Sequence, residues 1–202
     1  METHSSPLCG IWVNPRKTIQ EIIAKKPIKN IPLLIVLATI VIALKSNNLV
    51  YIFSSILTST IFVVLLTIVS ILAIFITYLI AEIIQWSGKK LGGQARQEEL
   101  RAVIAWSNIP VIWSILAWLI PFMLTPNNLD PALIQRINHI FYWIDFAFGA
   151  WASVIFIICL SEVQKFPIWK SFLNSLLSSL IIIGPILFIW GVIFLANYLK
   201  PS

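Results

Sequence analysis

Long apolar runs alternate with short polar connectors along the 202 residues of this chain. The longest run, residues 49–81, contains no Asp, Glu, Lys, Arg, Gly or Pro. As one helix it would be about 50 Å long, which exceeds the hydrocarbon core of about 30 Å. Its first part is rich in Ser and Thr, so we place the membrane-embedded part at 61–84. Unbroken apolar runs exclude the alternating strands of a membrane barrel and predict transmembrane helices.

The whole pattern predicts an all-α membrane protein, a five-helix transmembrane bundle preceded by a short amphipathic helix. The first apolar run is short for a crossing, which normally takes about 20 residues. Snorkelling of Lys29 and Lys45 and local thinning of the bilayer would let it span. The five spans are expected at about 31–44, 61–84, 102–124, 140–160 and 176–198, within one domain of residues 31–202.

Residues 1–30 form a polar arm with one helical signal. Asn14 and Pro15 are typical of a helix start, and Ile19, Ile22 and Ile23 then fall on one face. The pattern leaves two alternatives open: a basic amphipathic helix that lies on the membrane surface, or an ordinary helix packed under the bundle. Five cations surround the apolar face, namely Arg16, Lys17, Lys25, Lys26 and Lys29.

Composition supports the same class. Hydrophobic residues make up 59% of the chain, charged residues only 11%, and the mean hydropathy is +0.93. A soluble core of this size cannot bury so much apolar surface. The net charge of +6 does not indicate nucleic acid, because the cations lie in connectors rather than on one basic face. We interpret the charge as a topology signal that also attracts anionic lipid headgroups.

The distribution of cations predicts an orientation. With five spans, only Lys45, Arg136 and Lys200 of the 14 Lys and Arg residues fall on one side of the membrane, and the other eleven fall on the opposite side. Cytoplasmic connectors are enriched in Lys and Arg. The N-terminus and the loop around Gly92 are therefore expected in the cytoplasm, and the C-terminus on the opposite side.

Signatures of catalysis and cofactor binding are missing from the sequence. We find no P-loop, nucleophile elbow, zinc motif or dinucleotide fingerprint. Cys9 and Cys159 offer neither a disulfide framework nor a metal cluster, and His139 has no suitable neighbours for a metal site. We expect no cofactor, no metal and no enzymatic activity.

Two polar residues inside predicted spans are candidates for a function. Asp145 lies more than a turn inside an apolar helix, where an unpaired carboxylate costs a few kcal/mol. It is either a proton or cation site, or an interfacial residue reached by water or paired with a neighbour. Asn108 lies beside Pro110, where a kink is expected. Its amide either bonds a carbonyl freed by that kink or contacts a substrate.

The connector at residues 85–101 carries a defined turn and a helix restart. Gly92 and Gly93 break the preceding helix, and Glu98 and Glu99 then occupy the first turn of the next helix, where the helix dipole favours acids. We include both glycines, with Pro110, among the candidate functional positions.

Taken with the Asn-Pro-Arg and Lys-Pro pairs of the arm, this region resembles the Yip (Ypt-interacting protein) domain family. The resemblance covers nearly the whole chain and implies five spans with a cytoplasmic N-terminus. Eukaryotic members are linked with Rab-type GTPases and with traffic between endoplasmic reticulum and Golgi. This chain lacks their Asp-Leu-Tyr-Gly-Pro stretch and is similar to the compact prokaryotic branch, which implies a prokaryotic plasma membrane and does not carry over the GTPase partnership. The specific parts are Asn14-Pro15-Arg16, Lys26-Pro27, Leu91-Gly92-Gly93, Glu99-Leu100-Arg101, Ala105-Trp106-Ser107 and Ile109-Pro110.

Two hypotheses for the function follow. The leading one is a non-enzymatic Yip-type protein that organises the membrane or binds a partner, either another membrane protein or a second copy, through the basic arm and the Gly-Gly loop. The alternative is a small solute or ion permease, in which Asp145, Asn108 and the proline-kinked spans line a path.

Overall fold

A computed structural model describes residues 6–25, 30–46, 60–124 and 130–198. In these ranges every regular element is an α-helix. The short helices are α1 (Pro7–Val13), α2 (Pro15–Ala24), α3 (Ile31–Ser46), α6 (Gln97–Ser107) and α7 (Ile109–Leu124), and the long ones are α5 (Thr60–Lys90), α8 (Pro131–Gln164) and α9 (Ile168–Tyr198).

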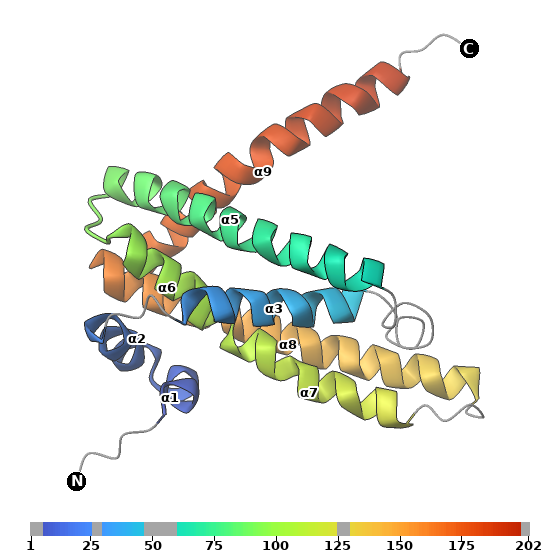
Figure 1. Ribbon diagram of the computed structural model, residues 1–202. Coiled ribbons are helices and arrows are strands. Elements are labelled where there is room, and N and C mark those ends of the chain that lie inside the picture. The colour runs from blue at the N-terminus through green and yellow to red at the C-terminus, as the bar shows by residue number, and fades with distance from the viewer. Residues whose placement is uncertain (1–5, 26–29, 47–59, 125–129, 199–202) are drawn as a thin grey trace.

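The helices form a bundle in which α3 lies among α5, α6 and α7, and α8 packs along α6 and α7 (Figure 1). α9 packs on α5 and α8 through its first half only. Among the α9 residues whose burial is described, the last buried one is Ser178, and beyond it the helix extends away from the bundle (Figure 1). α1 and α2 lie under one end of the bundle, against α6, α7 and α8.

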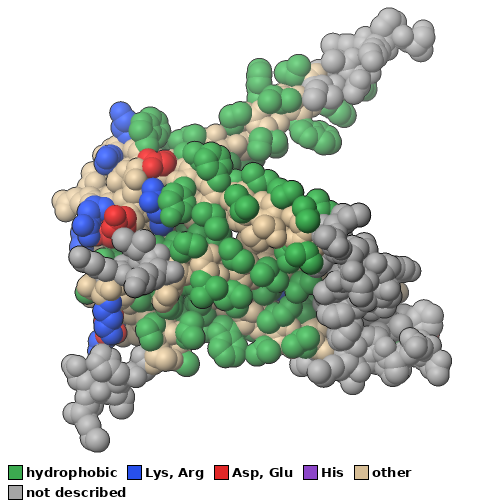
Figure 2. All heavy atoms as spheres, viewed as in Figure 1, with side chains coloured by type: hydrophobic (Ala, Val, Ile, Leu, Met, Phe, Trp, Pro, Cys, Tyr) green, Lys and Arg blue, Asp and Glu red, His purple; other side chains and the backbone are tan. Residues whose placement is uncertain are grey.

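Among the described residues, four helical segments are long and apolar enough to cross a membrane: Val63–Lys90, Gln97–Leu119, Gln135–Gln164 and Ile168–Val192. A fifth apolar segment, Ile31–Lys45, is shorter. Hydrophobic side chains cover the outside of the bundle, as Figure 2 shows for one face. Such an apolar exterior is compatible with lipid as the surrounding solvent.

The predicted third span consists of two helices rather than one kinked helix. α6 ends at Ser107, and α7 begins at Ile109 with Pro110 in its first turn. Proline lacks the N–H that would continue the ladder and its ring clashes with the carbonyl four residues back, whereas both features are tolerated in the first turn of a helix. The bend expected near Pro110 is therefore a break centred on Asn108.

The best-packed core lies at the end of the bundle that carries α1 and α2. Ile19 of α2 is fully buried, Ile22 is nearly so, and the amide of Gln20 donates to Oε1 of Glu162 on α8 at 2.6 Å. The structure therefore favours the second alternative for the arm, a helix packed under the bundle. Other fully buried core residues include Ile11, Leu100, Val103, Ile155 and Leu160.

Charged side chains gather at this same end (Figure 2). Exposed cations on α2, at the end of α5 and at the start of α6 lie beyond the apolar part of the bundle. The exposed described cations of this end are Arg16, Lys17, Lys25, Lys89, Lys90, Arg96 and Lys165. We refer to this end of the molecule as the basic end.

Candidate functional site

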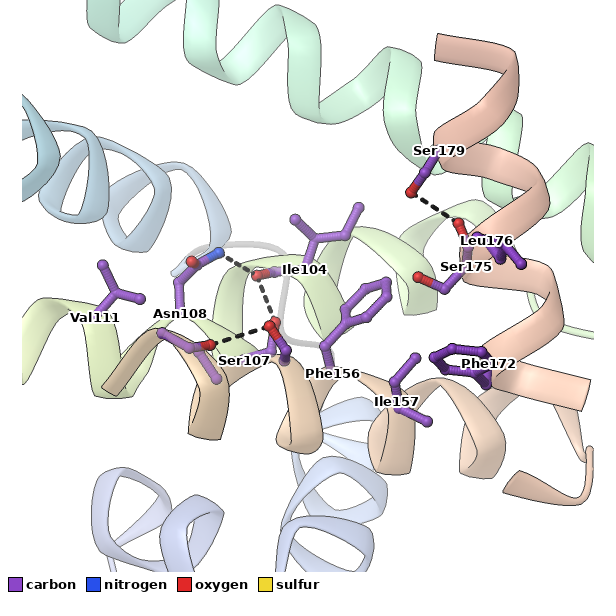
Figure 3. A pocket seen from close by; sticks show the side chains of 13 residues that line it. Ile104, Ser107, Asn108, Val111, Phe156, Ile157, Phe172, Ser175, Leu176 and Ser179 are labelled. Atoms are coloured by element: carbon purple, nitrogen blue, oxygen red, sulfur yellow. Dashed lines mark hydrogen bonds between the residues drawn. The ribbon is translucent and has the colours of Figure 1, made fainter. Parts of the chain in front are cut away.

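A groove of about 450 Å³ opens between the α6–α7 break, α8 and the first half of α9 (Figure 3). Its apolar lining includes Phe156 and Phe172. Hydroxyl and amide groups are interspersed among these apolar side chains, contributed by Ser107, Asn108, Ser153, Ser175 and Ser179. A groove of this lining offers hydrogen bonds beside an apolar surface, as sites for amphipathic ligands or for polar helix faces do.

Asn108 lines this groove at the helix break. Its backbone N–H bonds back to the carbonyl of Ala105, so the carbonyl of Ile104 lacks its usual partner four residues on. The side-chain amide of Asn108 donates to that carbonyl at 2.8 Å, and the hydroxyl of Ser107 donates to it at 3.0 Å (Figure 3). The break is thus satisfied locally, because two side chains donate to the carbonyl that it frees.

Gly149 and Ser153 line the α8 side of the groove. The spacing Gly-x-x-x-Ser predicts a helix face for close packing. In the structure no described atom beyond the neighbouring residues and backbone of α8 itself lies within 4 Å of the position that a Cβ on Gly149 would take. The hydroxyl of Ser153 donates to the carbonyl of Gly149 at 3.0 Å. This small-residue face therefore borders open space within the chain instead of a neighbouring helix.

Asp145 forms an ion pair that joins three helices. The ammonium group of Lys45 on α3 contacts the carboxylate of Asp145 on α8 and the hydroxyl of Ser114 on α7. The Lys45 side chain is 9% exposed and that of Asp145 is 35% exposed, while Ser114 is fully buried. Of the alternatives for Asp145, the structure shows pairing with a neighbour. The partner is a lysine that sequence analysis placed only at the end of the first span.

The ion pair and the groove are adjacent but separate. Asp145 lies one helical turn from Gly149 on α8, and Ser114 donates to the carbonyl of Val111, a groove residue, at 2.6 Å. Hydroxyl and carbonyl groups thus connect Lys45 to the groove lining. The two side chains that the sequence singled out, Asn108 and Asp145, do not bond to each other; each bonds to other groups.

Gly92 and Gly93 lie away from the groove, at the basic end. The N–H of Gly93 bonds to the carbonyl of Gly88 at 2.8 Å and the N–H of Gly92 to that of Lys89 at 3.1 Å. These two bonds are the Schellman pattern that ends a helix, and it requires the left-handed φ of 90° that Gly92 adopts. Gly93 permits close approach, because a Cβ there would collide with Oε1 of Gln164.

The loop that follows these glycines is held on both sides. The amide of Gln85 donates to the carbonyl of Ala95 at 3.0 Å, and Oε1 of Gln164 accepts from the N–H of Ala95 at 3.3 Å. Glu99 then accepts from the backbone N–H of Arg96 at 2.9 Å, which caps the start of α6. Residues 91–96 therefore form a fixed connection between α5 and α6.

A buried polar cluster between α5 and α9 was missed by sequence analysis. Asn174 is fully buried, and its side chain bonds to the hydroxyl of Ser87 and to the carbonyl of Ile84 at 3.3 Å. The hydroxyls of Ser87 and Ser178 lie 2.8 Å apart. The available signal was the polar pair Asn174 and Ser178, spaced one turn apart on α9, which is typical of interhelical hydrogen bonding.

These features define a multi-pass helical membrane protein with polar groups placed between its apolar helices. Within the described ranges, no three His, Cys, Asp or Glu side chains gather closely enough to hold a metal ion. A sequence model of the Yip1 domain family matches residues 9–200. The chain therefore belongs to the Yip1 domain family, as the Asn-Pro-Arg and Leu-Gly-Gly segments indicated. No match was found among curated proteins or among solved structures.

Proposed function

We propose that this chain is a non-enzymatic, five-span protein of the Yip type, which binds a membrane-protein partner at its basic end and organises the membrane around it. In this proposal α3 is the fifth span. The basic end, with α2 and the loop 91–96, faces the cytoplasm, and the C-terminus lies on the opposite side. The same end attracts anionic headgroups.

The ion pair supports α3 as a span. Its 16 residues measure about 24 Å along the axis, several Å less than a hydrocarbon core of about 30 Å. Lys45 at its far end would therefore lie inside the hydrocarbon, where an unpaired ammonium is costly. Contact with Asp145 neutralises that charge, so this short helix can serve as a span although its last turn lies inside the hydrocarbon.

The observation that carries the binding role is the fixed placement of α2. Its apolar face is buried through Ile19 and Ile22, and the Gln20 to Glu162 bond ties it to α8. Lys17 and Lys25 consequently remain exposed in a defined orientation. A surface that is already ordered loses less conformational entropy when it binds a partner.

Site-specific photo-crosslinking in intact membranes tests this role. A photoreactive residue is placed at Lys17 or Lys25, both exposed on α2, and at the matched position Arg136, an exposed cation near the start of α8. We expect a discrete protein adduct from positions 17 and 25 and none from 136. An adduct of twice the chain's mass would identify a second copy as the partner.

Charge reversal then tests specificity. Arg16→Glu should abolish the adduct from position 25, whereas Arg136→Glu should leave it intact. Adducts to lipid alone, or equal protein adducts from all three positions, would refute a partner at the basic end. Deleting the arm is a poorer experiment, because it removes Ile11, Ile19 and Ile22 from the core.

A second candidate function, a small solute or ion permease, is favoured by the polar connection from Lys45 through Ser114 to the groove. It meets one difficulty, since the carboxylate of Asp145 is already neutralised by Lys45. Purified protein in liposomes would have to conduct or exchange a solute, and Asp145→Asn would have to abolish that flux. Inert liposomes would reject this candidate.

A further inference from the structure

A second groove, of about 420 Å³, lies between α5 and α9. The Ser87, Asn174 and Ser178 cluster holds the two helices together near the basic end, and α9 then diverges from the bundle (Figure 1). The groove is lined by Trp86, Ser87 and Lys90 of α5 and by Leu177, Leu180 and Ile181 of α9. Apart from Lys90 and the buried hydroxyl of Ser87, its lining is apolar or aromatic.

The charge at the mouth of this groove is unbalanced. Lys90 lies in the last turn of α5, with its ammonium group 5.6 Å from the centre of the Trp86 ring. Lys170, in the first turn of α9, donates to the carbonyl of Leu91, the residue next to Lys90. Neither lysine forms an ion pair with any carboxylate in the described part of the chain. Elsewhere at the basic end, carboxylates pair with Lys17, Arg96, Arg101 and Lys165.

A structural role at the helix end accounts for only part of this arrangement. Lysines in the last turn of a helix interact favourably with its dipole, and that explanation applies equally to Lys89 and Lys90. Of these two lysines only Lys90 lines the groove, and its ammonium group lies over the Trp86 ring. Trp86 is more than half exposed, as expected for an indole at the level of the lipid headgroups.

We propose that this groove binds an anionic phospholipid. One acyl chain lies along Leu177, Leu180 and Ile181, which follow Lys170 by about 10 to 17 Å along α9. The phosphate is held by Lys90 and Lys170, so that the cationic mouth and the apolar groove recognise the two parts of one molecule. The proposal requires only that Lys90 lie at a membrane surface, and it is independent of the protein partner proposed above.

Native mass spectrometry of the full-length chain in detergent tests this site. The protein is titrated with phosphatidylglycerol and, separately, with phosphatidylcholine. We expect retention of phosphatidylglycerol and not of phosphatidylcholine. Lys90→Gln should lower the association constant about fivefold, which corresponds to about 1 kcal/mol for one cation near an anionic headgroup. Lys89→Gln, the matched control on the same turn, should leave the association constant unchanged.

Two further variants separate the headgroup from the groove. Leu180→Trp, at an exposed position, fills the groove without changing charge and should also weaken retention. Lys90→Arg keeps the charge and should preserve it. Equal losses for Lys89→Gln and Lys90→Gln, equal retention of phosphatidylcholine, no effect of Leu180→Trp, or no retention by the unaltered chain would each overturn the proposal. Circular dichroism verifies that every variant is folded.

Discussion

The ammonium group of Lys45 contacts the carboxylate of Asp145, although the two residues are 100 positions apart in the chain. The contact joins the last turn of α3 to the middle of α8, and the hydroxyl of Ser114 on α7 accepts a further bond from Lys45. Each charge alone would be costly between apolar helices, whereas the bonded pair is neutral as a whole. Asp145 is therefore one half of a structural unit in this state of the protein.

Removing one member of this pair should destabilise the bundle more than removing both. Lys45→Met leaves the Asp145 carboxylate without a counter-ion and should cost about 3 kcal/mol of unfolding free energy. The double variant Lys45→Met with Asp145→Asn should recover much of that loss. Thermal unfolding in detergent measures both, and a double-mutant cycle gives the coupling. Purely additive losses would show that the contact contributes nothing.

The two glycines Gly93 and Gly149 should respond differently to alanine. At Gly93 a Cβ would collide with Gln164 and lie 2.8 Å from Cζ of Phe166, so overpacking should cost about 1 to 3 kcal/mol. At Gly149 a Cβ would meet no described atom from outside α8 within 4 Å, so alanine should be neutral or stabilise the helix by up to about 1 kcal/mol. Melting temperatures compare the two. A destabilised Gly149→Ala would reveal packing outside the described chain.

Asn174 should matter more for stability than Asn108. Asn174→Ala removes the two bonds from this buried amide to α5 and leaves a cavity in its place, at a cost of about 2 kcal/mol. Asn108→Ala should cost less than about 1 kcal/mol, because Ser107 still donates to the same carbonyl. Unfolding scans of the two variants make the comparison. The reverse ranking would contradict the assigned hydrogen bonds.

The docking of α2 should depend on Ile19. This side chain is fully buried, and Ile19→Ala should cost about 2 to 5 kcal/mol if the cavity does not collapse. Hydrogen exchange of the α2 amides should accelerate, because the helix loses its main apolar contact. Lys17→Ala, on the exposed face, is the control and should change stability by less than about 0.5 kcal/mol. Unchanged protection of α2 in Ile19→Ala would refute the docked arrangement.

The helical class, the apolar segments and the family could be predicted from the sequence because lipid imposes simple rules on length and polarity. The Schellman turn at Gly92 was also predictable, since a helix that ends on Gly-Gly has few alternatives. The count of five spans stays a prediction, because α3 is shorter than the other apolar helices.

The partners of the polar residues could not be predicted. Lys45 and Asp145 are far apart in sequence, and nothing local indicates that the side chain at the end of α3 reaches α8. The Ala95 backbone is likewise held by glutamines from two different helices, which periodicity does not reveal. The face of Gly149 and Ser153 was expected to pack against a helix, but it borders a groove. The path of α9 depends on the packing of the whole bundle, so the spacing of two residues on α8 cannot indicate it.

The contact between Lys45 and Asp145 also has a consequence for membrane insertion during synthesis. In the proposed five-span arrangement, a ribosome delivers α3 well before α8, so Lys45 would enter the membrane before its counter-ion has been made. Until α8 emerges, α3 would have to stay hydrated, remain near the interface or be sheltered by the insertion machinery. Commitment of α3 to its final depth would thereby be deferred until more than two thirds of the polypeptide has been made.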